Sequence, residues 1–281
     1  MTILRNRKNR TLVLGGTGKT GRRVAERLQA AGHQVRIGSR SAIPSFDWDN
    51  EKGWDACLKG ITAVYITYAP DLAMPGAPDA IDAFVQRAEQ RGVKRLVLLS
   101  GRGEEEAQAC ERIVQNAGLE WTIVRASWFN QNFSEGAFID MVLSGTITLP
   151  AGDQVEPFVD LNDIADVAVA ALSQDHHHGQ IYEVTGPRLM TLADIASDLS
   201  EATSRQISYL DVPHDAFVAE ITNSGAPKEV VWMLDYLFST VLDGRNAYLC
   251  DGVQRALGRP PKDFADYARE VAATGVWSVA A

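Results

Sequence analysis

Glycines are concentrated in one seven-residue stretch near the start of the chain, Gly15-Gly16-Thr17-Gly18-Lys19-Thr20-Gly21. Their spacing permits a tight turn and a close approach of the backbone to a ligand. If a helix begins there, its first amide groups can hold a pyrophosphate, because helix N-termini attract anions. We therefore predict a dinucleotide-binding turn, with contacts from Gly15, Thr17, Gly18, Lys19, Thr20 and Gly21.

The end of this stretch, Gly18-Lys19-Thr20, also matches the last residues of a P-loop that binds ATP or GTP. That motif requires another glycine five residues before Gly18, where this chain has Val13. The sequence therefore disfavours a nucleoside triphosphate. A plain tight turn between a strand and a helix is the alternative without any ligand.

The choice between dinucleotides depends on the end of the second predicted strand, about 20 residues further on. An Asp or Glu there would bind the ribose diol of NAD, whereas this chain has Ser39-Arg40. The guanidinium of Arg40 can pair with the extra phosphate of NADP, and Ser39 can donate a hydrogen bond to it. We therefore predict NADP(H) as the cofactor. The alternative is that Arg40 is a solvated loop residue, as most arginines are.

Alternating strands and helices are expected to position these residues. The apolar run at 11–14 predicts a strand that is buried on both faces of a parallel sheet, and an amphipathic helix follows the glycines. Further strands are predicted at 34–38, 63–67, 95–100, 121–125 and 180–184, and helices at 80–91, 104–117 and 163–173.

This order of elements is typical of an α/β protein with a doubly wound parallel sheet of Rossmann type. We expect an NAD(P)-binding domain at 1–186 and a smaller, helix-rich C-terminal substrate part at 187–281. In the second part, Thr191 and Asp194 predict a capping box at the start of a helix.

Composition narrows the classes of partner. A net charge of −9 over 281 residues disfavours nucleic acid and membrane surfaces, so we expect a small-molecule substrate. The basic cluster Arg5, Arg7, Lys8 and Arg10 precedes no apolar stretch of the kind needed for secretion, which predicts a solvated N-terminal arm and a cytoplasmic protein. The sequence does not decide whether the protein forms a homodimer.

No metal site or disulfide is expected. Cys57, Cys110 and Cys250 are far apart and have no Cys-x-x-Cys spacing. The three consecutive histidines at 176–178 cannot all face one metal ion on a strand, whose side chains alternate between two faces.

Several segments together resemble the NmrA-like atypical short-chain dehydrogenases/reductases, which include NADPH-dependent quinone oxidoreductases and a fungal redox-sensing regulator. The resemblance covers most of the chain and is carried by residues 12–18, 92–100, 118–125, 128–132 and 158–165. The glycine turn with its Lys-Thr pair is also similar to bacterial relatives of ergot-alkaloid reductases. The substrate class is therefore left open.

The resemblance implies roles for residues at matching positions. Asp47 and Trp48 occupy the stretch where relatives contact adenine, and Asp47 is the candidate for its amino group. The segment Tyr68-Ala69-Pro70 should line the path of the ribose and nicotinamide, and Ser100 should lie near the nicotinamide. Tyr68 and Ser100 are thus the candidate catalytic residues. For Tyr68, ordinary packing of a strand-end aromatic is the alternative.

A pair of residues that the wider short-chain family uses for carbonyl reduction is absent. In that Tyr-x-x-x-Lys pair, the lysine lowers the tyrosine pKa so that the phenol can transfer a proton. None of the seven tyrosines here has a lysine four residues later, and residues 104–116 contain neither residue type.

Two readings follow from this absence. An enzyme would favour an acceptor that takes up hydride without a strong acid, such as a quinone, an iminium or a conjugated dye cation. A non-catalytic NADP(H)-sensing regulator is the alternative, and a sugar-nucleotide epimerase is disfavoured.

The loop after the predicted strand at 121–125 should form the substrate pocket, because ligands of open α/β sheets bind beyond the carboxyl ends of the strands. The predicted lining is Trp128, Phe129, Asn130, Asn132 and Phe133. These aromatic rings suit a flat acceptor, and packing between the two domains is the alternative.

Overall fold

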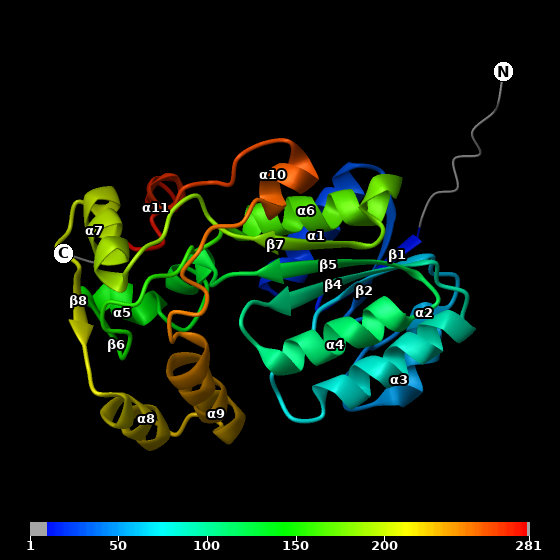
Figure 1. The fold of residues 1–281 in the computed structure, drawn as a ribbon, viewed down its shortest axis with the longest axis horizontal. Coiled ribbons are helices and arrows are strands. Elements are labelled where there is room, and N and C mark those ends of the chain that lie inside the picture. Colours follow the sequence, from blue (N-terminus) through cyan, green and yellow to red (C-terminus); the bar gives the residue numbers. More distant parts are fainter. Residues whose placement is uncertain (1–9, 280–281) are drawn as a thin grey trace. The chain divides into compact units, whose positions relative to one another are not determined.

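The computed structural model, which describes residues 10–279, contains a six-stranded sheet (Figure 1). Its strand order is β2-β1-β3-β4-β5-β7. The strands are β1 (Arg10–Leu14), β2 (Gln34–Gly38), β3 (Ala63–Ile66), β4 (Arg95–Gly101), β5 (Glu120–Ala126) and β7 (Gln180–Val184). The predicted arm residues Arg5, Arg7 and Lys8 lie outside the described range.

The pairings of the first four strands in the sheet are parallel. Strand β1 pairs with β2 on one side and with β3 on the other, and β3 pairs with β4. Because consecutive strands lie on opposite sides of β1, the strand order changes direction between β1 and β3. A crevice at such a switch point is the usual ligand site of an open α/β sheet. The predicted Rossmann-type architecture is confirmed.

Helices cover both faces of this sheet. In Figure 1, α1 (Lys19–Ala30) and α6 (Leu161–Ser173) lie over one face, and α3 (Ala77–Gln90) and α4 (Glu105–Asn116) lie over the other. Strand β1 is buried from Thr11 to Leu14, as expected for a strand that is covered on both faces. A short helix α2 (Trp54–Leu58) follows a 3-10 turn (Glu51–Gly53).

The described residues group into two compact units that interleave along the chain. Among these residues, unit 1 contains 10–100, 106–124 and 165–181, and unit 2 contains 101–105, 125–164 and 182–279. The sequence suggested a single division at residue 186. The grouping differs because residues 125–164, which follow β5, pack with the C-terminal residues.

Unit 2 has its own elements. A two-stranded parallel sheet joins β6 (Thr146–Leu149) to β8 (Ser208–Asp211). A 3-10 turn spans Asn130–Phe133, and a π-helical turn spans Leu237–Val241. Another 3-10 turn, Asp175–His177, belongs to unit 1. The helices are α5 (Ile139–Ser144), α7 (Leu192–Thr203), α8 (His214–Asn223), α9 (Lys228–Tyr236), α10 (Gly252–Leu257) and α11 (Phe264–Ala272).

Local signals explain parts of unit 2. The capping box of α7 is present: Thr191 Oγ1 accepts from the Asp194 amide at 3.1 Å, and the Asp194 carboxylate accepts from the Thr191 amide at 2.9 Å. Aromatic rings fill the core of this unit, among them Phe133, Phe264 and Trp277. By contrast, α9 is rich in apolar residues but has none that is fully buried.

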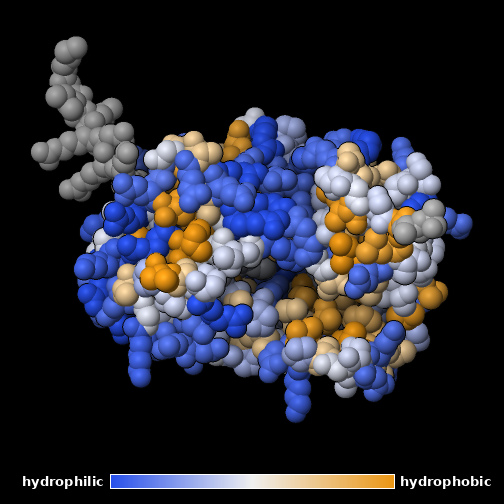
Figure 2. Space-filling view, turned by 180° about the vertical axis from the view of Figure 1, so that it is seen from behind, coloured by the Kyte–Doolittle hydropathy of each residue, from blue (hydrophilic) through white to orange (hydrophobic). Residues whose placement is uncertain are grey.

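One face of the protein is mostly polar. On the face in Figure 2, hydrophilic residues predominate and apolar residues gather in separate areas. Across residues 10–279, no helix has the length and apolar character needed to span a membrane. Among the described residues, the large apolar side chains that stay exposed are Ile43, Leu189, Leu210, Trp232, Tyr248, Leu249, Val276 and Val279.

The consecutive histidines have structural contacts within unit 1. His178 Nδ1 accepts a hydrogen bond from the Trp121 amide at 3.1 Å, and the His177 carbonyl accepts from Thr122 Oγ1 at 2.8 Å. The side chain of His177 is fully buried. In the described part of the chain, no group of three His, Cys, Asp or Glu side chains is placed to hold a metal ion. Cys57, Cys110 and Cys250 are free thiols.

Unit 2 contains a buried polar cluster formed by Arg102, Glu156 and Asn246. Arg102 donates to Ser127 Oγ at 2.8 Å, and Asn246 Nδ2 donates to the Arg102 carbonyl at 3.3 Å. Burial raises the pKa of Glu156 to about 7, against the opposing effects of the Arg102 charge and of a hydrogen bond from Asn246. The buried carboxyl therefore holds its proton more tightly in the folded protein than an exposed glutamate does.

This raised pKa predicts a pH-dependent stability. Between an ordinary glutamate pKa and about 7, the native state binds more protons than the unfolded chain, so stability falls as pH rises and levels off above that range. We expect Glu156→Gln to remove this loss, with a gain of at most about 3 kcal/mol at alkaline pH over the wild type. Urea unfolding at about pH 5 and about pH 8 measures it.

Glu201→Gln, at an exposed position of the same unit, is the matched control and should keep the wild-type pH dependence. An equal pH dependence in Glu156→Gln and the wild type would contradict the assignment.

Candidate functional site

The glycine turn connects β1 to α1 in unit 1. Gly15 has a φ of +60°, in the left-handed region that favours glycine, and its carbonyl accepts from the Gly18 amide at 2.8 Å. Gly16 donates to the carbonyl of Gly38, at the end of β2, at 3.4 Å. These bonds hold the turn at the carboxyl ends of β1 and β2.

Helix α1 packs directly on the backbone of this turn. A Cβ atom at Gly21 would lie 2.3 Å from the Gly15 carbonyl oxygen, and one at Gly15 would lie 2.5 Å from Thr67 Oγ1. Neither position can carry a side chain without displacement of its neighbours. The glycines therefore bring the start of the helix as close to the turn as the backbone allows, which is the geometry of a pyrophosphate-binding turn.

The start of α1 suits an anion. Gly18 is its N-cap, no side chain caps it, and its first turn contains no acidic residue. An anionic ligand there would meet main-chain amides and the positive end of the helix dipole. Lys19 and Thr20 are the first two residues of the helix and are partly exposed. Thr17 is exposed in the turn.

Thr67 was not among the residues predicted from the sequence. It follows β3, and its Oγ1 donates to the Leu14 carbonyl at 3.2 Å, so it ties β3 to the end of β1. Thr67 also limits the space beside Gly15. Only the strand order shows that these two strand ends are neighbours.

The loop after β2 presents Arg40. It folds back on itself, because the Phe46 amide donates to the Ser39 carbonyl at 2.9 Å and Ser45 Oγ donates to the Arg40 carbonyl at 2.9 Å. Ser39 is partly exposed and Arg40 is exposed. Within residues 10–279 the Arg40 guanidinium has no ion-pair partner. A phosphate could therefore pair with it without displacing a carboxylate.

Asp47 and Trp48, the residues predicted to contact adenine, also form contacts within the protein. The indole N–H of Trp48 donates to the Thr67 carbonyl at 3.1 Å, and the Trp48 ring lies 5.0 Å from that of Phe46. Asp47 accepts from the Asp49 amide at 3.2 Å, and its carboxylate is partly exposed. Trp48 thus braces the end of β3, while Asp47 keeps a surface that a ligand can reach.

Tyr68 packs against Trp48. Its ring lies 5.0 Å from that of Trp48, and burial raises its pKa. A proton-donating tyrosine of the short-chain type needs a shift in the opposite direction. The next two residues, Ala69 and Pro70, are exposed after the carboxyl end of β3.

Ser100 lies at the carboxyl end of β4 and is 4% exposed. Its Oγ donates to Glu111 Oε1 on α4 at 2.7 Å. Glu111 is 2% exposed and was not predicted as a site residue. Its signal in the sequence is a carboxylate on the apolar face of an amphipathic helix.

The predicted substrate residues belong to unit 2 and differ in exposure. Trp128 is partly exposed, with its ring 5.2 Å from that of Phe238, and Phe129 and Asn132 are also partly exposed. Asn130 and Phe133 are fully buried, and Phe133 belongs to the aromatic core. A ligand could therefore contact the first three without rearrangement of the core.

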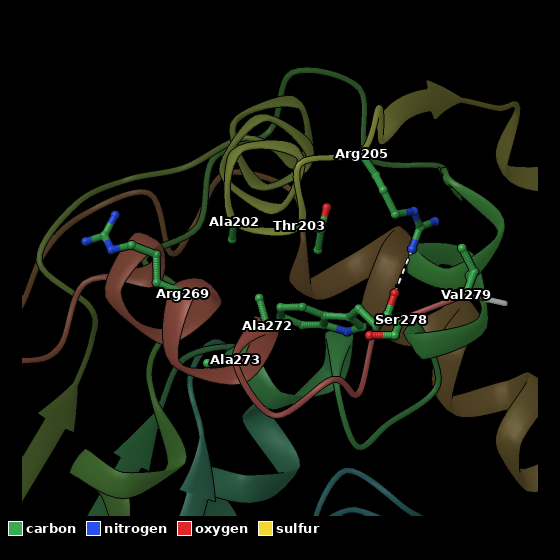
Figure 3. Close-up of a pocket in the computed structure, with 9 residues that line it drawn as sticks. Ala202, Thr203, Arg205, Arg269, Ala272, Ala273, Ser278 and Val279 are labelled. Carbon is green, nitrogen blue, oxygen red and sulfur yellow. Dashed lines mark hydrogen bonds between the residues drawn. The ribbon is translucent and has the colours of Figure 1, made fainter. Parts of the chain in front are cut away.

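A cavity of about 490 Å³ lies elsewhere in unit 2, between α7, α11 and the residues after α11 (Figure 3). Arg205 donates to the Trp277 carbonyl at 2.7 Å and to the Leu143 carbonyl at the end of α5 at 2.8 Å. These bonds give Arg205 a structural role. The residues that line the cavity include none of the predicted site residues.

Comparisons with known proteins identify the family of the chain. The sequence model of a family described as NAD(P)H-binding matches residues 15–175. Agroclavine dehydrogenase of Claviceps fusiformis is 31% identical over 277 residues, which cover 91% of this chain and 95% of that protein.

Two solved structures share the fold. NADPH-dependent quinone oxidoreductase QOR2 of Escherichia coli, solved with NADPH, has a TM-score of 0.78 at 19% identity and covers 93% of this chain and 99% of its own. The negative transcriptional regulator NmrA, solved with NAD, has a TM-score of 0.71 at 16% identity and covers 97% of this chain and 100% of its own. Since the matched region begins at the glycine turn and spans more than half of the sequence, the protein belongs to the NAD(P)H-binding family.

Proposed function

We propose that this protein is an NADPH-dependent reductase that transfers hydride to a small conjugated acceptor, either quinone-like or iminium-like. The observation that carries the proposal is the turn at Gly15–Gly21, where the helix start is held against the backbone and presents amides to an anion. Family membership supports a pyridine nucleotide as that anion.

The preference for NADP(H) over NAD(H) is supported by the loop after β2. Arg40 is exposed and has no acidic partner in the described part of the chain, and Ser39 beside it is neutral. A carboxylate at this position would bind a ribose diol and repel a phosphate. The positive charge of Arg40 favours the phosphorylated nucleotide.

The nature of the acceptor follows from the groups available for proton transfer. The bound cofactor supplies the hydride. The chain contains no Tyr-x-x-x-Lys pair, and the pKa of Tyr68 is raised instead of lowered. An acceptor that is reduced without a strong protein acid fits these residues best, and the protein would orient it and exclude water.

We assign the acceptor contacts to Trp128, Phe129 and Asn132, with Asn130 and Phe133 as buried support. Aromatic rings and a neutral amide suit a flat conjugated molecule. The similar proteins support this class, because one is named as a dehydrogenase of agroclavine and another as a quinone oxidoreductase.

A sensor without turnover is the second candidate. The missing proton-transfer pair and the fold shared with the regulator NmrA favour it. In that case the same turn and Arg40 would bind the nucleotide, and no acceptor would be reduced.

Oxidation of NADPH by an acceptor distinguishes the reductase from the sensor. We expect the protein to oxidise NADPH in the presence of at least one member of a panel of quinones, iminium compounds and conjugated dye cations, measured as loss of absorbance of the reduced nicotinamide. Tight NADPH binding with no oxidation across the panel would contradict the reductase and favour the sensor.

A methyl group at Gly21 tests the turn. Because the new Cβ would lie 2.3 Å from the Gly15 carbonyl oxygen, Gly21→Ala should push α1 away from the turn and weaken nucleotide binding by about tenfold or more. Calorimetric titration with NADPH measures this.

Gly118→Ala makes the same chemical change in unit 1, where the new Cβ would meet only the Glu89 side-chain oxygen at 3.2 Å. It should bind NADPH like the wild type. Unaltered NADPH affinity in a folded Gly21→Ala variant would argue against a pyrophosphate site at the turn.

Removal of the Arg40 charge tests the nucleotide preference. A charge-assisted contact contributes about 1.5–3 kcal/mol, so Arg40→Ala should weaken NADPH binding by about ten- to a hundredfold and leave NADH binding nearly unchanged. Arg112→Ala removes another exposed arginine of unit 1 and should alter neither affinity. Equal losses for both nucleotides in Arg40→Ala would refute a specific phosphate contact.

A further inference from the structure

Glu111 occupies a position where a carboxylate is costly. The inward face of α4 is formed by Ala107, Cys110, Glu111 and Val114, and all four side chains are buried. An apolar residue at position 111 would avoid the cost of removing a carboxylate from water. A glutamate that is 2% exposed at such a position indicates a role beyond the packing of the helix.

The hydrogen bond to Ser100 shows what the carboxylate does. Ser100 Oγ donates to Glu111 Oε1 at 2.7 Å. A serine hydroxyl has one proton and two lone pairs, so a hydroxyl that donates to a carboxylate can offer only lone pairs to any other group. Glu111 therefore fixes Ser100 as a hydrogen-bond acceptor.

The position of Ser100 identifies the group that it could accept from. It lies at the carboxyl end of β4, the strand next to β3 and two strands from the glycine turn, on the side of the sheet where ligands bind. A nicotinamide ring carries one carboxamide, whose NH₂ group is a hydrogen-bond donor. A serine hydroxyl that can only accept would form a hydrogen bond with this NH₂ group. It would form none with a methyl ketone at the same position, because a methyl ketone has no donor.

We propose that Glu111 is a positioning residue that holds Ser100 as the acceptor for the carboxamide N–H of the nicotinamide. The inference rests on the proposed function, because it requires a pyridine nucleotide bound across the carboxyl ends of the strands. The contact would fix the rotation of the carboxamide and thereby the orientation of the ring.

Binding of a nucleotide that lacks the NH₂ group tests this role without turnover. In the 3-acetylpyridine analogue of NADP⁺, a methyl group replaces the NH₂ group, and the rest of the molecule is the same. One hydrogen bond contributes about 0.5–1.5 kcal/mol, so the wild type should bind NADP⁺ about two- to tenfold more tightly than the analogue. Calorimetric titration of the full chain with each nucleotide gives this ratio.

The variants change only the hydrogen-bond character of the pair. Ser100→Ala removes the acceptor and should bring the ratio to about one. In Glu111→Gln the amide can donate to Ser100, which turns the serine proton outward toward a ligand, so the ratio should fall to about one or reverse. A purely structural role of Glu111 would weaken both nucleotides equally and leave the ratio unchanged.

Two further variants complete the test. Ser100→Thr keeps the hydroxyl and should retain the wild-type ratio, so it reports on the role even if Glu111→Gln fails to fold. Glu106→Gln removes an exposed carboxylate from the same helix and should also retain it.

The outcomes separate this inference from the proposed function. A wild-type ratio near one, or a wild-type ratio retained in folded Ser100→Ala, would overturn the role of the pair while nucleotide binding stands. Absence of binding of both nucleotides to the wild type would overturn the proposed function as well.

Discussion

The close contact between Gly21 and the Gly15 carbonyl is the constraint on which the candidate site depends. The gap at this point is too small for a Cβ atom, so the first turn of α1 and the end of β1 behave as one rigid piece of backbone. The same piece is fixed from the side by Thr67, which bonds to the Leu14 carbonyl, and from β2 by the bond between Gly16 and Gly38. Three neighbouring strands thus hold one set of amides in place.

The Rossmann-type fold and the local geometry of the candidate site could be predicted from the sequence. The glycines, the missing carboxylate at Arg40 and the alternation of elements are local signals, and each depends on residues that are close together in the chain. Thr67 and Glu111 were missed for the opposite reason. Their roles depend on neighbours 53 and 11 residues away, and only the strand order and the face of α4 bring those neighbours together.

The second unit was predicted less completely. Strand β8 was missed because three of its four residues are exposed, so its sequence lacks the alternation that marks a half-buried strand. The grouping of residues 125–164 with the C-terminal part depends on contacts between distant aromatic residues, such as Phe133 with Phe264 at 5.9 Å. Pattern reasoning along the chain cannot detect such contacts.

The backbone amides of the turn between β1 and α1 offer the sharpest test of a pyrophosphate site. Amide NMR spectra of the ¹⁵N-labelled protein, recorded during titration with NADP⁺ and with NAD⁺, report which N–H groups meet the ligand. If the turn holds the pyrophosphate, the signals of Thr17, Gly18, Lys19 and Thr20 should move most with both nucleotides. Saturable binding that leaves these four signals in place and moves others would contradict a pyrophosphate site at the turn.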